Sequence, residues 1–427
     1  MFKFTKPWSF FQAGVLLLGS ALVAGCGTPS LQPLGIGSNA DGLSLKTSSK
    51  ALFQISKTIE TSAWARIERL SSNCPEFPKE NARSNGRQTD PEIVEAFGTA
   101  TPPSSDVLLH YAKGWDKNTG TPVLLVHGAL VDANTSWALS GSKEGLLKTL
   151  TDKGMRVFAV TFAHRHGDNL LQAESIKYAL TRVRQVTGAK KVDVVSHSKG
   201  TVAARALASD FRYPWMTPYQ NDIRRLVLVA GPNLGMDFTF RHPIVNLALY
   251  PEKDNRLFNA PMSWSKTMIM GIWVDTSKQS MATDNGNYFP GQSQLLYRWD
   301  KKYPLPMTEQ DWYTTYHGGQ GFISISQGID KAIADGGDFI ETLRKHPLNK
   351  DVNLLVLAGD HADVQGILNE NTGPSDGVVF VESATHTEDM LKGGAKLFAK
   401  QVLHLNHTEL ISNSESKDWI AKQLARP

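Results

Sequence analysis

Ser198 has the local sequence that most strongly indicates chemistry in this chain. It lies in Ser196-His197-Ser198-Lys199-Gly200, after the apolar stretch 192–195 and before the small-residue stretch 201–207. The first stretch predicts a β-strand and the second a helix. A serine on a sharp strand-to-helix turn exposes its hydroxyl at the carboxyl end of a sheet, provided that small residues flank it two positions away. Ser196 and Gly200 meet this requirement, so the pattern favours a nucleophile over a serine that only caps a helix.

A serine hydroxyl is a weak nucleophile until a base takes its proton. His407 follows the last predicted strand, 396–405, so it can reach across the carboxyl edge of a sheet to Ser198. His404 falls on that strand and His386 in the polar stretch before it. We expect both of these to be structural or surface residues.

The base needs a carboxylate that fixes its tautomer. Three aspartates are candidates: Asp376, and the alternatives Asp360 and Asp363, which follow the predicted strand 352–359 directly. The first amides of a helix that starts after Ser198, including that of Lys199, could stabilise a developing oxyanion.

These residues need a sheet to hold them, and apolar stretches alternate with helical ones in the chain from Asp106 onward. This alternation predicts a parallel sheet with helices on both faces. The expected strands lie at 107–111, 122–128, 155–161, 192–195, 223–231, 352–359 and 396–405, and the expected helices at 173–186 and 201–207.

With these motifs the chain resembles the α/β-hydrolase superfamily, and within it the bacterial secreted lipases and esterases, from about Asp106 to the C-terminus. Four segments carry the resemblance: His127-Gly128-Ala129, Ser196-His197-Ser198-Lys199-Gly200, Ser375-Asp376-Gly377-Val378-Val379 and Asn406-His407-Thr408-Glu409-Leu410. Their order matches the family order of nucleophile, acid and base. The resemblance implies Ser198, Asp376 and His407 as catalytic residues, with the main-chain amides of Ala129 and Lys199 binding the oxyanion.

We expect the other histidines near these motifs, and the Lys199 side chain, to have no direct part in the chemistry. We expect His127 to orient the oxyanion loop and His197 to pack beside the nucleophile turn. His164 and His166 follow a strand end and are expected to line the cleft or its rim. The Lys199 ammonium is expected to point to solvent.

The predicted core, 106–232 and 351–427, is interrupted by a segment too long for an ordinary loop, 233–350. This segment is expected to form a cap or lid beside the catalytic face, whose aromatic side chains either line an apolar substrate pocket or form the cap's own core. These side chains include Phe238, Tyr250, Trp264, Trp273, Tyr288, Phe289, Trp299, Trp312, Tyr313 and Phe322.

The residues before the predicted core are expected to direct the protein to the cell envelope and to attach it there through residues 1–50, with 51–105 belonging to the folded part. Lys3 and Lys6 precede the apolar run 13–24, which is short for a membrane span and typical of a signal peptide, here 1–25. The sequence Val23-Ala24-Gly25-Cys26 resembles a bacterial lipobox, which implies lipidation of Cys26. Residues 26–50 would then form a lipidated tether. Residues 51–105 are expected to form a helix, on the spacing of apolar residues over 52–67, and an irregular wrap over the surface.

Composition limits the partners. The 45 Lys and Arg residues nearly balance the 41 Asp and Glu residues, for a net charge of +4, so nucleic acid is not an expected partner. With Cys26 lipidated, Cys74 would be the only free thiol and no intrachain disulfide could form. No cofactor is expected, and a calcium site at Asp360, His361 and Asp363 has no recognised ligand spacing.

The expected activity is hydrolysis of apolar acyl esters through an acyl-serine intermediate. The enzyme would be anchored by lipid to a bacterial envelope membrane. The outer membrane is expected in preference to the inner one, because Gly27 rather than aspartate follows Cys26. If the lipobox is unused, the protein would be secreted. Two alternatives remain: an acyltransferase or polyester depolymerase with the same residues, and a non-catalytic envelope lipoprotein that binds a lipid or a partner. The sequence leaves the oligomeric state open.

Overall fold

Nine strands form the central sheet of the computed structural model, in the order β1-β2-β3-β7-β4-β8-β9-β14-β15. The strands are β1 (Phe53–Ile59), β2 (Arg66–Ser72), β3 (Asp106–Tyr111), β4 (Val123–Val126), β7 (Val157–Phe162), β8 (Val192–His197), β9 (Ile223–Val229), β14 (Asn353–Gly359) and β15 (Lys396–Leu403). The structure describes residues 51–80, 87–140, 143–241, 264–269, 272–275, 290–305, 313, 316–320, 324–326, 328–365 and 369–427.

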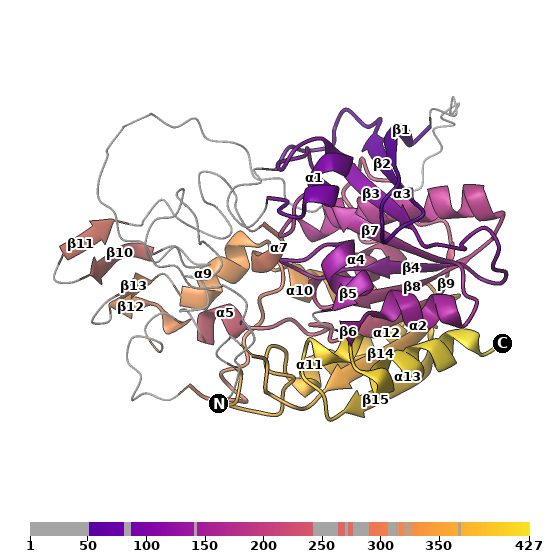
Figure 1. Ribbon diagram of the computed structural model, residues 1–427. Coiled ribbons are helices and arrows are strands. Elements are labelled where there is room, and N and C mark those ends of the chain that lie inside the picture. The colour runs from indigo at the N-terminus through magenta and orange to yellow at the C-terminus, as the bar shows by residue number, and fades with distance from the viewer. Residues whose placement is uncertain are drawn as a thin grey trace, which may run out of the picture. The chain divides into compact units, whose positions relative to one another are not determined.

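The pairing of the strands changes direction once along the sheet. The pairs β1·β2, β2·β3 and β3·β7 are antiparallel, and the pairs from β7 to β15 are parallel. An antiparallel strand pair before the crossed order β7-β4-β8, followed by parallel strands, is the arrangement of the α/β-hydrolase fold. The predicted fold class is therefore confirmed. In Figure 1, β14 is drawn in orange and β15 in yellow, and β14 lies between β9 and β15 in the sheet.

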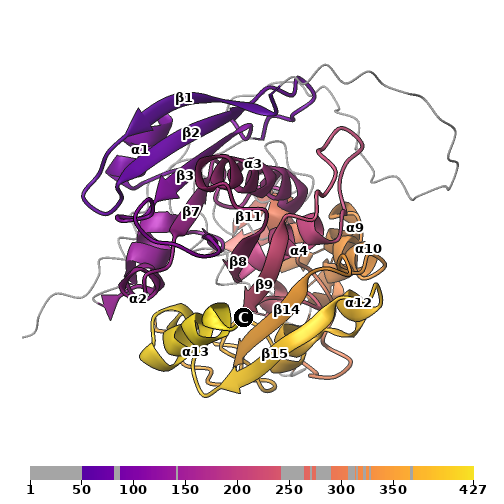
Figure 2. The ribbon, with the colours of Figure 1, turned by 90° about the vertical axis from the view of Figure 1, so that its right-hand side faces the viewer.

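Helices cover both faces of the sheet (Figure 2). The helices of the core are α1 (Pro91–Phe97), α2 (Leu146–Asp152), α3 (Asn169–Thr187), α4 (Lys199–Ala208), α11 (Val381–Thr385), α12 (Glu388–Leu391) and α13 (Ser414–Ala425), with a π-helix, η2 (Asn134–Ala138), and a 3₁₀-helix, η3 (Glu409–Ile411). A small pair, β5 (Leu139–Ser140) and β6 (Lys143–Glu144), follows η2.

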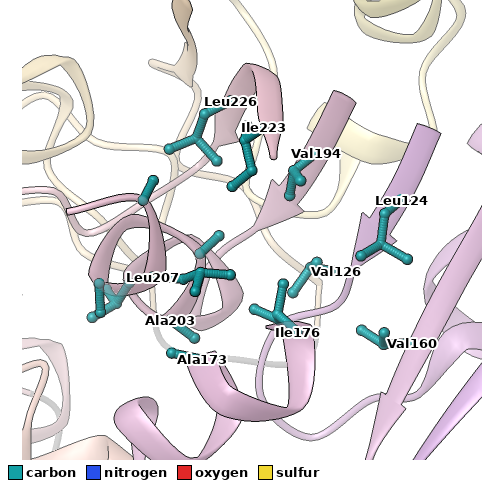
Figure 3. Close-up of a cluster of buried hydrophobic side chains, with 14 of the residues drawn as sticks. Leu124, Val126, Val160, Ala173, Ile176, Val194, Ala203, Leu207, Ile223 and Leu226 are labelled. Carbon is teal, nitrogen blue, oxygen red and sulfur yellow. The ribbon is translucent and has the colours of Figure 1, made fainter. Parts of the chain in front are cut away.

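Alternate residues of the parallel strands pack into two different cores, because successive side chains of a strand point to opposite faces. Val194 packs with the helices α3 and α4 in one cluster, and Val195 packs with α2 and α13 in the other. Figure 3 shows part of the first cluster, to which α3 contributes Ile176, α4 contributes Ala203 and the strand β8 contributes Val194. The strands β4, β7, β8, β9 and β14 are thus buried on both faces, which explains why they are largely apolar, whereas most of the edge strand β15 is not buried.

The expected helix over 52–67 is wrong: these residues form β1, the turn after it and the start of β2. Phe53, Ile55 and Ile59 share a strand's two-residue spacing, and β2 pairs with β3 along its whole length. Within the expected irregular wrap, residues 91–97 form the helix α1. Its ends carry ordinary signals, an Asp90 N-cap and a left-handed Gly98 C-cap.

The segment 233–350 is described in part. It contains α5 (Phe238–Arg241), α7 (Pro290–Ser293), α9 (Gly328–Asp335) and α10 (Phe339–Leu343), and a separate antiparallel sheet in the order β11-β10-β13-β12. The strands of that sheet are β10 (Trp264–Ile269), β11 (Ile272–Asp275), β12 (Gly319–Gln320) and β13 (Ser324–Ser326).

In the segment 233–350, the aromatic side chains of Phe238 and Trp299, both named above, are buried in hydrophobic clusters. Tyr250, Tyr288, Phe289, Trp312 and Phe322 lie outside the described residues.

Candidate active site

Ser198 occupies a strained turn between β8 and α4. Its φ of 53° and ψ of −130° lie in a region that non-glycine residues seldom adopt. The main-chain N–H of Ser198 donates to the carbonyl of Val229 at 2.9 Å, which ties the turn to the neighbouring strand. The Ser196 hydroxyl, at the position where the related motif usually has glycine, donates to the Val227 carbonyl at 3.1 Å. This extra side chain is therefore accommodated inside the sheet.

Two glycines allow the Ser198 turn to pack against the loop after β4. A Cβ on Gly200 would lie 2.2 Å from the carbonyl oxygen of His127, and a Cβ on Gly128 would lie 2.9 Å from Cβ of Ser198. No real Cβ contact is that short, so both positions require glycine. The approach brings Gly128 directly against the Ser198 side chain.

His407 connects Ser198 to Asp376. The imidazole Nε2 lies 2.9 Å from Oγ of Ser198, and Nδ1 lies 2.9 Å from Oδ2 of Asp376. A carboxylate only accepts, so Nδ1 carries the hydrogen and Nε2 is free to accept from the serine hydroxyl. His407 and Asp376 are 7 % and 0 % exposed, so this chain of hydrogen bonds is shielded from water.

The second oxygen of Asp376 is also fixed. Oδ1 accepts hydrogen bonds from the main-chain N–H groups of Val378 and Val379, at 3.0 and 2.8 Å. With one oxygen on these amides and the other on His407, the carboxylate has a single orientation.

The loop that carries His407 is shaped by Asn406. Its Oδ1 accepts from the main-chain N–H groups of Thr408 and Glu409, and its Nδ2 donates to the carbonyl of Asp363. Short side chains of this kind stabilise tight turns by bonding to nearby backbone. The turn after β15 thereby presents His407 to the carboxyl edge of the sheet.

The alternative residues lie elsewhere. Asp360 bonds to His404 on the protein surface, at 2.9 Å between Oδ1 and Nδ1. Asp363 contributes its main-chain carbonyl to Asn406, and the His386 ring bonds to Asp389 at 2.8 Å. Of the three candidate acids, Asp376 is the one that the structure brings to the His407 ring.

The loop after β4 is held at both ends by β7. The ring Nε2 of His127 accepts from the N–H of Phe162 at 3.1 Å, so its Nδ1 carries the hydrogen and donates to the Gly128 carbonyl at 2.7 Å. The N–H of Ala133 donates to Oγ1 of Thr161. Burial lowers the pKa of His127 to about 3, so this ring stays neutral.

This bond also orients the predicted oxyanion amide. The carbonyl of Gly128 and the N–H of Ala129 belong to one trans peptide unit and point in opposite directions. Because the carbonyl faces the His127 ring, the Ala129 N–H faces away from it. The other predicted donor, the Lys199 N–H, belongs to the first turn of α4, whose amides have no acceptor within the helix.

The side chain of Lys199 differs from expectation: it is 2 % exposed rather than directed to solvent. Its Nζ donates to Oε1 of Gln172 at 2.6 Å, and a Cβ on Gly291 would lie 2.4 Å from its Cε. Burial lowers the pKa of Lys199 to about 7, against the opposing attraction of Glu80 and Asp168. The helix α7 covers this lysine, a contact between distant segments that its local sequence does not reveal.

His164 and His166 are also buried rather than placed at a rim, with exposures of 2 % and 0 %. The ring Nδ1 of His166 accepts from Nε2 of Gln292 at 3.0 Å, and its carbonyl accepts from the N–H of Gly291. Gln294 adds bonds to the start of α3, at Asp168 and Asn169. These bonds fasten residues 290–294 of the cap segment to the loop after β7.

A buried ion pair joins the cap segment to the loop that carries Asp376. The Arg241 guanidinium contacts Asp237 at 2.8 Å and Glu370 at 3.7 Å. The main chain of Glu370 in turn brackets Asp376, because its N–H donates to the Gly377 carbonyl and its carbonyl accepts from the Ser375 hydroxyl.

In the described part of the chain, no three His, Cys, Asp or Glu side chains gather as metal ligands would. Among the same residues, no helix combines the length and apolar character needed to cross a bilayer. Cys74 is a free cysteine, and the predicted lipidation site Cys26 lies outside the described residues.

Residues 93–253, less than half of the chain, match the family model of a domain of unknown function, DUF7379. No curated protein matches the sequence.

Among solved structures, the mature Bacillus licheniformis lipase BlEst2 is similar, with 13 % identity and a TM-score of 0.39 over 71 % of this chain and 91 % of that one. The Pyrococcus furiosus esterase Pf2001 has 13 % identity and a TM-score of 0.38, with 75 % and 85 % of the two chains covered. Clostridium botulinum EstA has 13 % identity and a TM-score of 0.39, with 72 % and 88 % covered.

Proposed function

We propose that this protein is a serine hydrolase of carboxylic esters that works through an acyl-serine intermediate. The observation that carries the proposal is the hydrogen-bonded chain Ser198–His407–Asp376, with 2.9 Å at each link. The strained backbone of Ser198 adds support, because such strain persists where the surrounding structure holds a functional side chain in place.

Each group in the chain has a defined task in this reaction. Nε2 of His407 takes the Ser198 proton as Oγ attacks the ester carbonyl carbon, and the carbonyl π electrons move to the oxygen. The resulting imidazolium is stabilised by Asp376 and donates its proton to the leaving alcohol as the C–O bond breaks. Water then attacks the acyl-serine with the same base, which releases the acid and restores the serine.

The tetrahedral oxyanion would be bound by the main-chain amides of Ala129 and Lys199. A donor of this kind contributes about 3–4 kcal/mol to transition-state stabilisation in enzymes where one has been removed. The bonds from His127 to Gly128 and from Ala133 to Thr161 support this role, because they hold the loop through groups of the protein itself. Such preorganisation avoids a rearrangement during the reaction.

The proposed substrates carry an apolar acyl group. Leu130 follows the oxyanion residue, has a φ of 67° and is 39 % exposed, which is unusual for a large apolar side chain. A left-handed backbone is costly for leucine, and such strain is typical of functional loops, so we infer that this exposed apolar side chain contributes to binding the acyl group. The lipobox around Cys26 supports the further proposal that the enzyme is anchored to a bacterial envelope membrane, where lipid esters are plentiful.

Labelling with a fluorophosphonate tests the proposal. The full-length protein in detergent micelles is treated with the probe beside Ser198→Ala and, as a matched control, Ser196→Ala, and p-nitrophenyl esters of increasing chain length follow. We expect wild type and Ser196→Ala to be labelled and active, and Ser198→Ala to be neither. A folded wild-type protein that is neither labelled nor active would refute the proposal and favour a binding protein.

A further inference from the structure

The imidazole of His197 links the nucleophile's strand to the main chain of the proposed base. His197 is the last residue of β8, and its Nε2 lies 3.0 Å from the carbonyl oxygen of His407. The two rings are neighbours, with centroids 4.9 Å apart, and His197 is 6 % exposed. The residue directly before Ser198 is thus bonded to a residue 210 positions away.

The hydrogen bond has one possible direction. A carbonyl oxygen only accepts, so Nε2 of His197 carries the hydrogen and donates it. In the neutral ring Nδ1 then has no hydrogen, and among the described residues it has no hydrogen-bond partner. Burial lowers the pKa of His197 to about 3. The ring therefore remains an uncharged donor to His407 at neutral and alkaline pH.

Both main-chain polar groups of His407 form hydrogen bonds, one to Asp376 and one to His197, the residue before Ser198. Its N–H donates to the main-chain carbonyl of Asp376 at 2.9 Å, and its carbonyl accepts from His197. The backbone of the base is thereby fixed on the acid side and on the nucleophile side, which fixes the point from which the imidazole reaches Oγ of Ser198.

We propose that His197 is a positioning residue that sets the distance between Nε2 of His407 and Oγ of Ser198. This inference rests on the proposed function, because it takes His407 as the base. If His197 only filled space, an apolar side chain of similar size would serve as well. If it positions His407 through its hydrogen bond, a side chain that retains a donor at the same place is required.

Two substitutions separate these roles. His197→Gln keeps an N–H donor at nearly the reach of Nε2, and His197→Leu keeps the bulk without the donor. His386→Leu is the matched control, because it removes a histidine hydrogen bond to Asp389 outside the site. Hydrolysis of p-nitrophenyl butyrate is measured with the full-length proteins, and thermal unfolding shows whether each variant is folded.

We expect His197→Leu to lower kcat by about 10- to 100-fold with KM changed less than about twofold, because displacement of a reacting group by about 1 Å can cost about 100-fold. His197→Gln should stay within about threefold of wild type, and His386→Leu should match wild type. Wild-type kcat in a folded His197→Leu would overturn the inference. A folded His197→Gln that is as slow as His197→Leu would overturn it too.

An NMR signal of the His407 ring tests the positioning role of His197 without measuring enzyme turnover. The result is therefore independent of whether the protein proves to be a hydrolase. In protein with ¹⁵N-labelled histidine, the Nδ1–H of His407 gives a proton signal, which is assigned by its absence in His407→Gln. We expect the signal to be sharp in wild type and His197→Gln and to be broadened in His197→Leu by faster exchange with water. An inactive, unlabelled wild type would refute the hydrolase, whereas a sharp signal in His197→Leu would refute the positioning.

Discussion

Replacement of Asp376 with asparagine tests whether the orientation of the His407 ring drives the chemistry. In the native protein Oδ1 of Asp376 accepts from two main-chain N–H groups, of Val378 and Val379, and Oδ2 accepts from Nδ1–H of His407. An asparagine must keep its oxygen on the two amides, because an NH₂ group there would face two donors. Its NH₂ group then faces Nδ1 of His407.

The consequence for His407 is a change of tautomer. Nδ1 must accept from the asparagine, so the ring hydrogen moves to Nε2, which then faces Oγ of Ser198 as a donor. A ring in that form cannot take the serine proton. The equivalent change in a serine protease lowers kcat by about 10⁴-fold, which corresponds to about 5.5 kcal/mol in activation free energy. We expect a loss of that order here, because the amide pair prevents the asparagine from turning.

The assay is the initial rate of p-nitrophenyl butyrate hydrolysis at pH 8, with thermal unfolding as the check on folding. Asp360→Asn is the matched control, because Asp360 is an exposed carboxylate that also bonds to a histidine, His404. It should keep at least half of the wild-type rate. The reasoning fails if a folded Asp376→Asn retains a tenth of the activity, or if the two variants lose equal amounts.

Three further predictions concern close packing and buried charge. Gly200→Ala places a Cβ 2.2 Å from the His127 carbonyl, so we expect the loop to move and kcat to fall by about 100-fold, measured with the same ester. Gly291→Ala places a Cβ 2.0 Å from the Gly167 carbonyl oxygen. Overpacking should lower the free energy of unfolding by about 1–3 kcal/mol, measured by urea titration. An unchanged urea midpoint of unfolding would contradict the close packing of Gly291. Burial lowers the pKa of Lys199 to about 7, so between pH 7 and 10 the unfolded chain binds one proton more than the folded one, and stability rises with pH. Relative to Lys199→Met, the wild-type free energy of unfolding should increase by up to about 1.4 kcal/mol per pH unit in that range, and a flat difference would show that the amine is not buried as described.

Local sequence was sufficient to predict much of the fold. The strands β4, β7, β8, β9 and β14 could be predicted because parallel strands that are buried on both faces are largely apolar stretches. The expected strands at 107–111 and 396–405 are also present, as β3 and β15, although β3 pairs in the antiparallel direction and most of β15 is not buried. The turn at Ser198 was predicted because the tight approach of Gly200 to His127 allows only a small residue. The hydrogen bonds among Ser198, His407 and Asp376 required the structure, since the residues come from three separated loops. Their catalytic roles remain a prediction.

The wrong predictions concern residues whose conformation depends on segments far away in the sequence. The β1–β2 hairpin was predicted as a helix because apolar spacing over 52–67 suits both, and the pairing of β2 with β3 decides between them. The Lys199 side chain was expected in solvent, as for most lysines. Its burial depends on Gln172 and Gly291, which are far from it in sequence and could not be recognised as its partners.

The parallel pairing of β9 with β14 has a consequence for how the chain reaches its native state. About 120 residues separate the two strands in sequence, so β9 is synthesised long before the strand that covers its outer edge. Non-local parallel pairing is slow, and an apolar strand with an open edge can pair with another chain in the meantime. The stretch Leu226–Val229, fully buried in the native protein, is exposed during that interval. The yield of refolding should therefore fall as protein concentration rises, and chaperones that shield open strand edges should raise this yield.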